Sequence, residues 1–435
     1  MTLATENRPV SIRDGANAGH GFTLQALLMM AVFAIVFDRF SYGPISASNC
    51  LLILTLFLWV ADVSRGRRKV YGRKWLLIMG AVAAAVGVSV VVSDDATRSA
   101  RAGFSILAMC GISFLIVNLI RDERRIRRVI YALLLAGILV SLSSILQAVV
   151  FYATGRILFY GQLPYEELGG VVVIRPIGFY WDPNYLGLFL IVPFLMGWGM
   201  WSELSRFWRI GLLVILVALL LTLSRGVLLP LGAFTGAYTL ARLFRAWRRG
   251  RVRVYSLLFA IAAILGLSLM AIGIVIRGGV TTQSTITRAM VTQNALELIS
   301  ERPWFGWGPG KLVGIQWELG LLERAQELAA GRPFEEDLTQ QVTHNVLLQM
   351  LLWIGMLGTV CIISGGVYVW RLYRRALRIS RPLWLQAIAL SLFGYLLTAL
   401  FLDGLLAKQV WVALSLLISG SMYVIHQSGE DAYRR

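Results

Sequence analysis

The stretch T-H-N-V-L-L-Q-M-L-L-W-I-G, residues 343–355, is where the longest polar interval of this chain returns to apolar sequence. That polar interval begins at Arg277, and His344 lies at its far end. The chain has only three histidines, and the other two, His20 and His426, lie near its termini. His344 is therefore the histidine placed for chemistry at the edge of an apolar segment.

The composition predicts an all-α polytopic membrane protein. The chain has 435 residues, of which 57% are hydrophobic, and long apolar runs recur along its whole length. Such runs are expected to be helices, because backbone polar groups in lipid must be satisfied within each segment. The net charge of +18 does not indicate nucleic acid, since the basic residues form short clusters between apolar runs. The three cysteines lie inside apolar runs, which favours neither a disulfide nor a zinc site.

We predict about twelve transmembrane helices. They are placed at approximately 22–40, 45–63, 75–93, 104–120, 129–150, 185–201, 209–223, 226–241, 255–276, 344–370, 382–402 and 405–425. With this alternation, most basic clusters fall on the same side as both termini. The positive-inside rule then predicts cytoplasmic termini and an outward-facing polar interval.

The predicted organisation follows from these spans. It consists of a cytoplasmic tail (1–21), transmembrane helices 1–9 (22–276), an outer loop subdomain (277–343), transmembrane helices 10–12 (344–425) and a second cytoplasmic tail (426–435). The outer loop subdomain is predicted to contain a helix at 285–300, a Pro- and Gly-rich turn at 301–310, and a second helix at about 311–330. Its aromatic residues are expected to rest at the membrane interface.

His344 has the chemistry of a general base. A helix N-terminus disfavours imidazolium, so a histidine at the start of span ten is expected to be neutral near pH 7. A neutral histidine can accept a proton from a hydroxyl group. The alternative is a histidine that only caps the helix or hydrogen-bonds a neighbouring loop.

Four arginines lie in the outward-facing segments, against the usual charge bias. Arg225 lies between two apolar runs, and Arg175, Arg288 and Arg302 lie in the outer intervals. A guanidinium group suits a phosphate ligand, although Arg225 could also be a snorkelling side chain. Together with a neutral histidine, these residues suit one task, which is to hold a lipid-linked pyrophosphate while an incoming hydroxyl is deprotonated.

Metal and nucleotide chemistry are less favoured. The adjacent Asp94 and Asp95 suit a solvated loop or a helix cap, and Glu335-Glu336-Asp337 suits a solvated turn. No phosphate-binding loop of the nucleotide-hydrolase type occurs in the sequence. We therefore predict no metal site and no cofactor. In the outer stretch at 171–187, Asp182 or Asn184 is expected to cap the following helix.

Several motifs resemble those of bacterial O-antigen ligases. The first is His344-Asn345 followed after nine residues by Gly355-x-x-Gly358-Thr359, and the second is Arg225-x-x-x-Leu229. The stretch R-P-I-G-F-Y-W-D-P-N (175–184) and the turn P-W-F-G-W-G-P-G (303–310) resemble the wider ligase and polymerase superfamily.

This resemblance implies a glycosyltransferase-C type fold of about twelve helices with a large periplasmic loop, in the bacterial inner membrane. It implies metal-independent transfer of O-antigen polysaccharide from undecaprenyl pyrophosphate to a sugar hydroxyl of lipid A–core. Within it, His344 is the expected general base, and Arg225 and Arg288 are the expected pyrophosphate ligands. Arg175 is an expected support residue. Attack opposite the leaving group would invert the anomeric centre.

Three other functions stay open at this stage. An O-antigen or exopolysaccharide polymerase would use the same donor with a lipid-linked glycan as acceptor, and a protein O-oligosaccharyltransferase would use a protein acceptor. A polysaccharide or lipid transporter would instead carry charges in the middle of its spans, where this sequence has few. Loss of activity on substitution of His344 is expected for glycosyl transfer and not for transport.

Overall fold

The structure is a computed structural model of the chain. It describes residues 13–40, 46–158, 165–168, 171–180, 182–248, 281–313, 343–402 and 404–428. The predicted span at 255–276 lies outside these residues, as does most of the predicted helix at 311–330. Residues 311–313 are described and are not helical, so a helix does not begin at Lys311.

The described residues are mainly helical, and every predicted span other than 255–276 overlaps a helix. The helices are α1 (Arg13–Ala34), η1 (Ile35–Phe40), α2 (Ala47–Ser64), α3 (Arg73–Val91), α4 (Ala96–Leu119), α5 (Glu123–Thr154), α6 (Pro183–Gly199), η2 (Trp201–Glu203), α7 (Arg206–Leu221), α8 (Arg225–Arg248), α10 (Thr281–Glu301), α12 (Val346–Ile379), α13 (Leu383–Ala399) and α14 (Lys408–Gln427). The first helix begins at Arg13, within the segment predicted to be a polar tail.

Length and apolar surface identify a multi-pass membrane protein. Six of the described helices, α2, α3, α4, α5, α12 and α14, are long and apolar enough to cross a membrane, and α6 and α13 are shorter apolar helices. Large apolar side chains on α2 and α3 face outward, with Phe57 70% and Leu77 73% exposed. Apolar surface of this kind is favourable against lipid and unfavourable in water. The number of twelve spans stays a prediction.

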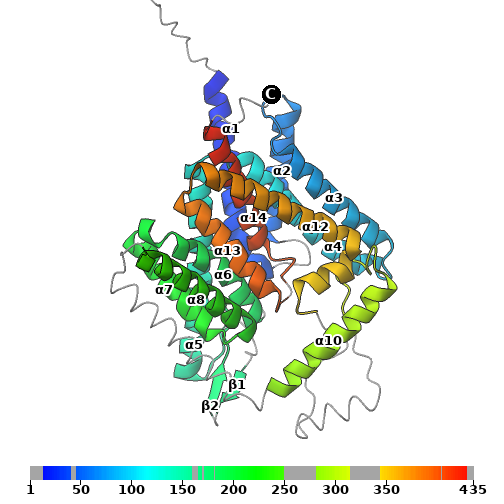
Figure 1. Ribbon diagram of the computed structural model, residues 1–435, viewed down its shortest axis with the longest axis vertical. Coiled ribbons are helices and arrows are strands. Elements are labelled where there is room, and N and C mark those ends of the chain that lie inside the picture. The colour runs from blue at the N-terminus through cyan, green and yellow to red at the C-terminus, as the bar shows by residue number, and fades with distance from the viewer. Residues whose placement is uncertain are drawn as a thin grey trace, which may run out of the picture.

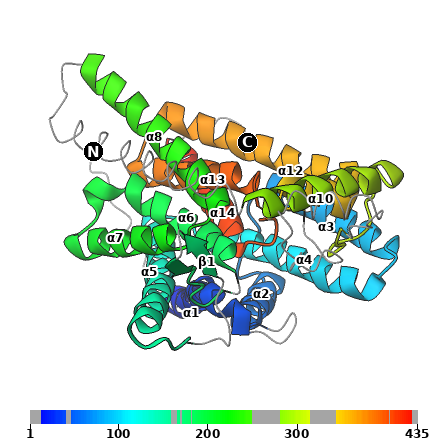
Figure 2. The same cartoon turned by 90° about the horizontal axis from the view of Figure 1, so that it is seen from below.

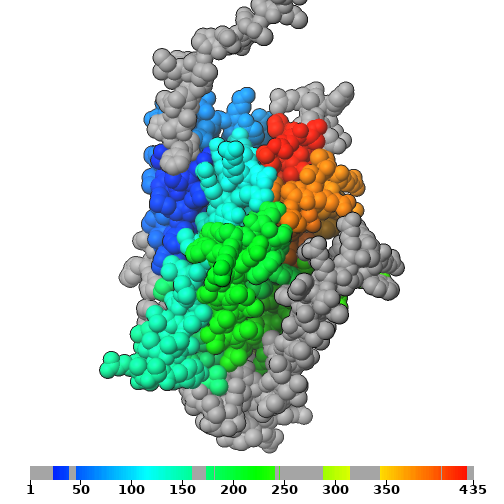
Figure 3. Space-filling view, turned by 90° about the vertical axis from the view of Figure 1, so that its left-hand side faces the viewer, coloured from blue at the N-terminus to red at the C-terminus, as the bar shows by residue number. Residues whose placement is uncertain are grey.

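The helices form one packed bundle in which segments distant in sequence lie together (Figures 1 and 2). Helix α13 packs chiefly against α6, and α14 contacts α4, α12 and α13. A side chain at Gly199 would meet the Cα atom of Ala387 at 2.8 Å, so a small residue there allows α6 and α13 to approach closely. In the space-filling view, the first, middle and last helices share one continuous face (Figure 3).

A short β-hairpin departs from the predicted all-helical fold. Strand β1 (Tyr165–Leu168) pairs antiparallel with β2 (Val171–Ile174). The run of valines in β2 suits a strand, because β-branched side chains pack well on a pleated surface. The hairpin and α10 lie at the same end of the bundle, opposite the C-terminal end (Figure 1). The hairpin and α10, which belong to the two intervals predicted to face outward, therefore lie at one end of the described bundle.

Candidate active site

His344 lies immediately before α12 rather than inside it. The helix is capped by Asn345, whose side-chain oxygen accepts hydrogen bonds from the backbone N–H groups of Leu347 (2.9 Å) and Leu348 (3.1 Å). His344 itself has a φ angle of +46°, in the left-handed region that non-glycine residues seldom occupy. Because Asn345 supplies the cap, the imidazole of His344 is not used for that purpose.

The surroundings of His344 keep its imidazole neutral. Burial is the first cause and the nearby positive charge of Arg288 is the second, and together they lower the pKa of His344 from 6.5 to about 4. The sequence predicted the neutral state correctly but attributed it to the helix terminus. The imidazole Nδ1 atom is buried, and within the described residues it has no hydrogen-bond partner. The side chain is therefore neutral at pH 7 and able to take up a proton.

Replacing Arg288 by glutamine is expected to raise the pKa of His344 above about 4, because removal of a nearby positive charge favours imidazolium. Burial should still hold the pKa below 6.5. The pKa is measured by NMR titration of ¹³C-labelled histidine, and three histidines make assignment by substitution practicable. The matched control is Arg156→Gln, which removes an exposed arginine just after α5. Equal pKa values for His344 in the two variants would contradict the coupling.

Helix α12 is broken at Gly355, and this break holds the turn that follows α10, the helix that carries Arg288. Gly355 has φ +64° and ψ −172°, a conformation found essentially only in glycine. The carbonyl groups of Leu352 and Trp353 accept hydrogen bonds from the backbone N–H groups of Trp307 (2.8 Å) and Gly308 (3.1 Å). The turn after α10 is thus bonded to the open backbone of α12.

On the other side of Gly355, backbone N–H groups of α12 donate hydrogen bonds to carbonyl groups of the turn after α10. The backbone N–H of Met356 donates to the carbonyl of Pro303 (2.7 Å), and that of Leu357 donates to the carbonyl of Trp304 (3.3 Å). A side chain at Gly306 would meet Gly355 N at 2.7 Å, which leaves no room for any residue larger than glycine. Gly306 and Gly355 therefore allow a backbone-to-backbone junction between α12 and the turn after α10.

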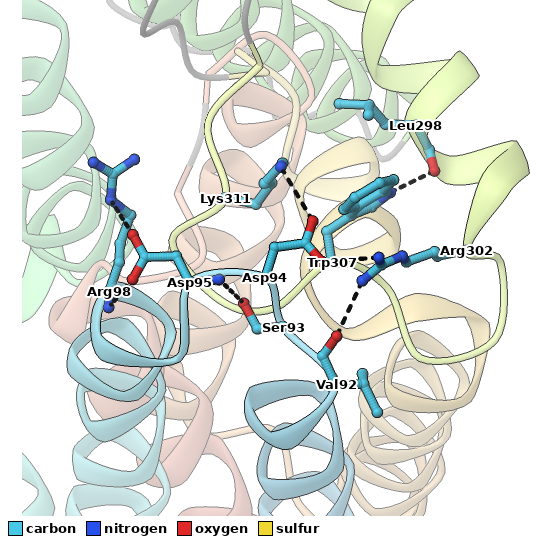
Figure 4. Close-up of polar contacts among 9 residues, drawn as sticks. All are labelled: Val92, Ser93, Asp94, Asp95, Arg98, Leu298, Arg302, Trp307 and Lys311. Carbon is cyan, nitrogen blue, oxygen red and sulfur yellow. Dashed lines mark hydrogen bonds and ion pairs between the residues drawn. The ribbon is translucent and has the colours of Figure 1, made fainter.

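Arg302 fastens this turn to a second loop (Figure 4). Its guanidinium donates to the carbonyl of Val92 (3.0 Å), forms an ion pair with Asp94 (2.8 Å), and lies 4.0 Å from the ring centre of Trp307. From the sequence, Arg302 is predicted to belong with the arginines that suit a phosphate ligand. These contacts instead use its guanidinium to join the end of α10 to the loop between α3 and α4.

Arg225 is the first residue of α8 and follows a strained turn. Leu223 has a φ angle of +49°, which is unfavourable for a branched residue. Arg175 donates to the carbonyl of Thr222 (2.9 Å) and to the side chain of Asn184 (3.3 Å), which also accepts from Ser224 (2.5 Å). Arg175 and Asn184 therefore hold the turn that presents Arg225.

The turn before α8 and the start of α12 both contact one short segment. The side chain of Asn345 donates to the carbonyl of Leu400 (3.0 Å), and a side chain at Gly226 would meet Leu402 at 3.3 Å. Within the described part of the chain, no carboxylate lies within ion-pair distance of Arg225. Residues 400–402 thus contact both the turn that precedes Arg225 and the turn that contains His344. The guanidinium of Arg225 is the cation in this region that has no carboxylate partner among the described residues.

A buried polar cluster that was not predicted from the sequence lies where α14 begins. Lys408 is 8% exposed and forms an ion pair with Asp38 (2.7 Å), and its ammonium also donates to Ser48 and Asn49 (2.6 Å each). A lysine and an aspartate at the edges of apolar runs are the signal that could have indicated it. The cluster ties α14 to η1 and α2.

Of the two alternatives predicted for Asp94 and Asp95, a solvated loop or a helix cap, Asp95 is a helix cap. The Asp95 carboxylate accepts a hydrogen bond from Arg98 N (2.9 Å) at the start of α4, and Asp182 caps α6 in the same way through Asn184 N (2.6 Å). Among the residues that the structure describes, no group of three or more His, Cys, Asp or Glu side chains is arranged to hold a metal ion. The predicted Glu335-Glu336-Asp337 turn lies outside those residues.

Residues 210–363 match the family model described as O-antigen ligase. The resemblance to the O-antigen ligase family is confirmed over this stretch. It covers about a third of the chain and contains Arg225, Arg288, the 301–310 turn and His344, while Arg175 lies before it. The match to O-antigen ligases supports a transferase of the ligase and polymerase superfamily. No curated protein matches the chain.

Proposed function

We propose that this protein is an O-antigen ligase, which transfers polysaccharide from undecaprenyl pyrophosphate to a sugar hydroxyl of lipid A–core. The observation that carries the proposal is the neutral His344 beside Arg288, inside the stretch that matches O-antigen ligases. A neutral imidazole next to a fixed positive charge suits the removal of a proton from an acceptor while an anionic leaving group departs.

In this proposal each site residue has one role. His344 accepts the proton of the attacking hydroxyl, and Arg288 and Arg225 bind the pyrophosphate oxygens. The hydroxyl oxygen forms a bond to the anomeric carbon as the bond to the pyrophosphate oxygen breaks, with inversion, and the arginines stabilise the charge left on undecaprenyl pyrophosphate. Arg175 positions the Arg225 turn through Thr222 and Asn184. The donor brings its own leaving group, so the proposal needs neither ATP nor a metal ion.

The proposed location is the bacterial inner membrane, with about twelve spans, both termini in the cytoplasm and the site facing the periplasm. Helix α10 and the turn after it belong to the proposed periplasmic loop at 277–343. The position of α10 and the β-hairpin at one end of the bundle supports a single functional face (Figure 1).

A transfer assay tests the proposal. Purified protein in nanodiscs receives undecaprenyl-pyrophosphate-linked glycan, with and without lipid A–core, in the absence of ATP and the presence of EDTA. Glycan on lipid A–core is the expected product. Longer lipid-linked chains, with lipid A–core unused, would replace the ligase by a polymerase. No transfer by folded protein would overturn both functions and favour a transporter.

Replacing Arg225 by alanine is expected to reduce kcat/KM for the donor by about 10- to 100-fold, because hydrogen bonds to a charged group are worth about 1.5–3 kcal/mol. Arg225→Lys should recover part of the loss, since lysine keeps the charge but lacks the planar fork. Initial rates at varied donor concentration measure the effect, with exposed Arg206→Ala as the control. Unchanged donor kinetics in Arg225→Ala would remove this residue from the site.

A further inference from the structure

A second polar site lies where the loop between α3 and α4 meets the turn after α10 (Figure 4). A cavity of about 320 Å³ is present there, at the lower end of the size range of small-molecule sites. Its lining includes Ser93, Asp95, Arg98 and Ser99 from one side, and Pro309 and Lys311 from the other. One side of the cavity is therefore formed by the turn after α10, which is hydrogen-bonded to α12 at Gly355.

Ser99 gives this cavity a buried group that lacks a partner. Ser99 lines the cavity and is 1% exposed, and its hydroxyl has no hydrogen-bond partner within the described residues. Buried hydroxyl groups are normally hydrogen-bonded, so the Ser99 hydroxyl retains the capacity to bond a ligand. The neighbouring Gly308 has no side chain, and a Cβ atom there would collide with the hydroxyls of Ser93 and Ser99. Glycine at this position therefore lets the turn approach both hydroxyls closely at the edge of the cavity.

Each carboxylate at the cavity is paired with a basic side chain. Asp94 lies 2.8 Å from Arg302 and 3.9 Å from Lys311, and Asp95 lies 3.6 Å from Arg98. Two carboxylates disfavour a phosphate ligand, and the neighbouring guanidinium and ammonium groups disfavour a metal ion. A neutral ligand with many hydroxyl groups suits this lining, because each hydroxyl both donates to a carboxylate and accepts from a cation.

We propose that this cavity is a saccharide subsite, which binds one or two sugar residues of a glycan substrate through Asp95, Arg98 and Ser99. The proposal rests on the proposed glycosyl transfer, since it gives that site a second point of attachment for the same glycan. The first segment of α12, from Asn345 to Ile354, spans about 14 Å at 1.5 Å per residue and separates His344 from the turn. Sugars several positions from the reacting bond would occupy the subsite.

The proposal is tested by binding rather than by transfer. Two lipid-free saccharides are titrated by calorimetry into the full chain in nanodiscs. One is the glycan released from the donor by mild acid, and the other is core oligosaccharide. The double variant Arg98→Gln/Ser99→Ala is compared with Arg101→Gln/Ser105→Ala, the same changes on α4 at positions outside the cavity lining. Tm is measured for each, and the exposed Arg98–Asp95 pair is expected to contribute little to it.

The expected result is that wild type and the control bind one saccharide equally, and that Arg98→Gln/Ser99→Ala binds it about tenfold more weakly at unchanged Tm. The saccharide that binds identifies the source, either donor glycan or acceptor core. Absence of binding by wild type, or equal binding by all three proteins, would overturn the subsite whatever the transfer assay shows. Binding with the expected differences but without transfer would overturn only the proposed function.

Discussion

Replacing His344 by alanine is expected to reduce the rate of glycan transfer by about 10²- to 10⁴-fold, which is the usual contribution of a positioned general base. The structure gives the physical reason, because burial and Arg288 keep this imidazole neutral and its Nδ1 atom has no partner among the described residues. Initial rates of transfer at saturating donor measure the effect. His426→Ala, at the exposed end of α14, is the matched histidine control and should retain the wild-type rate.

The pH dependence of stability is a second measurement, and it distinguishes an effect of His344 on catalysis from an effect on folding. The pKa of His344 is about 4 when folded and 6.5 when unfolded, so below pH 6.5 the unfolded chain binds more protons at this residue. Protonation of His344 in the unfolded chain therefore lowers the free energy of unfolding progressively as the pH falls from 6.5 towards 4. Above pH 6.5 this effect is absent. His344→Ala should be less sensitive to acid than wild type over this range. A His344→Ala protein that transfers glycan at the wild-type rate would refute the general-base role.

Replacing Gly355 by alanine is expected to destabilise the protein by about 3 kcal/mol or more, and to lower transfer although Gly355 is not itself a site residue. The Gly355 conformation is essentially restricted to glycine, and a residue held in such a sparsely populated region costs about 1–3 kcal/mol. The new Cβ atom would also overlap the carbonyl of Trp304. Relief of that overlap separates the turn from α12 and breaks hydrogen bonds that hold α10 near His344.

Thermal unfolding and transfer rate, measured on the same preparation, test this expectation. Gly366→Ala is the matched control, because it lies on the same helix with no atom within 4 Å of the added Cβ. Alanine favours helix by about 1 kcal/mol over glycine, so the control should be as stable as wild type or more stable. Equal Tm values for the Gly355→Ala and Gly366→Ala proteins would contradict the junction.

Local sequence patterns were sufficient to predict where most of the described helices lie and to predict two of their caps. The apolar runs predicted the helices because the length and hydrophobicity of a run can be read from consecutive residues alone. The helix at 285–300 corresponds to α10, and the Pro- and Gly-rich turn follows it as predicted. The caps at Asp95 and Asp182 were also predictable, since a cap needs only the residues of one helical turn.

Sequence alone determined that this protein is a helical membrane protein with His344, Arg225 and Arg288 outside its apolar runs. Tertiary structure decided which of the polar residues meet, because their contacts join segments far apart in the chain. It placed Arg288 close enough to lower the pKa of His344, and it joined the turn after α10 to the broken backbone at Gly355. It also used Arg302 for an ion pair with Asp94, which no local pattern encodes. Motif spacing identifies such residues, but only packing determines whether each one binds a neighbour or remains available to a substrate.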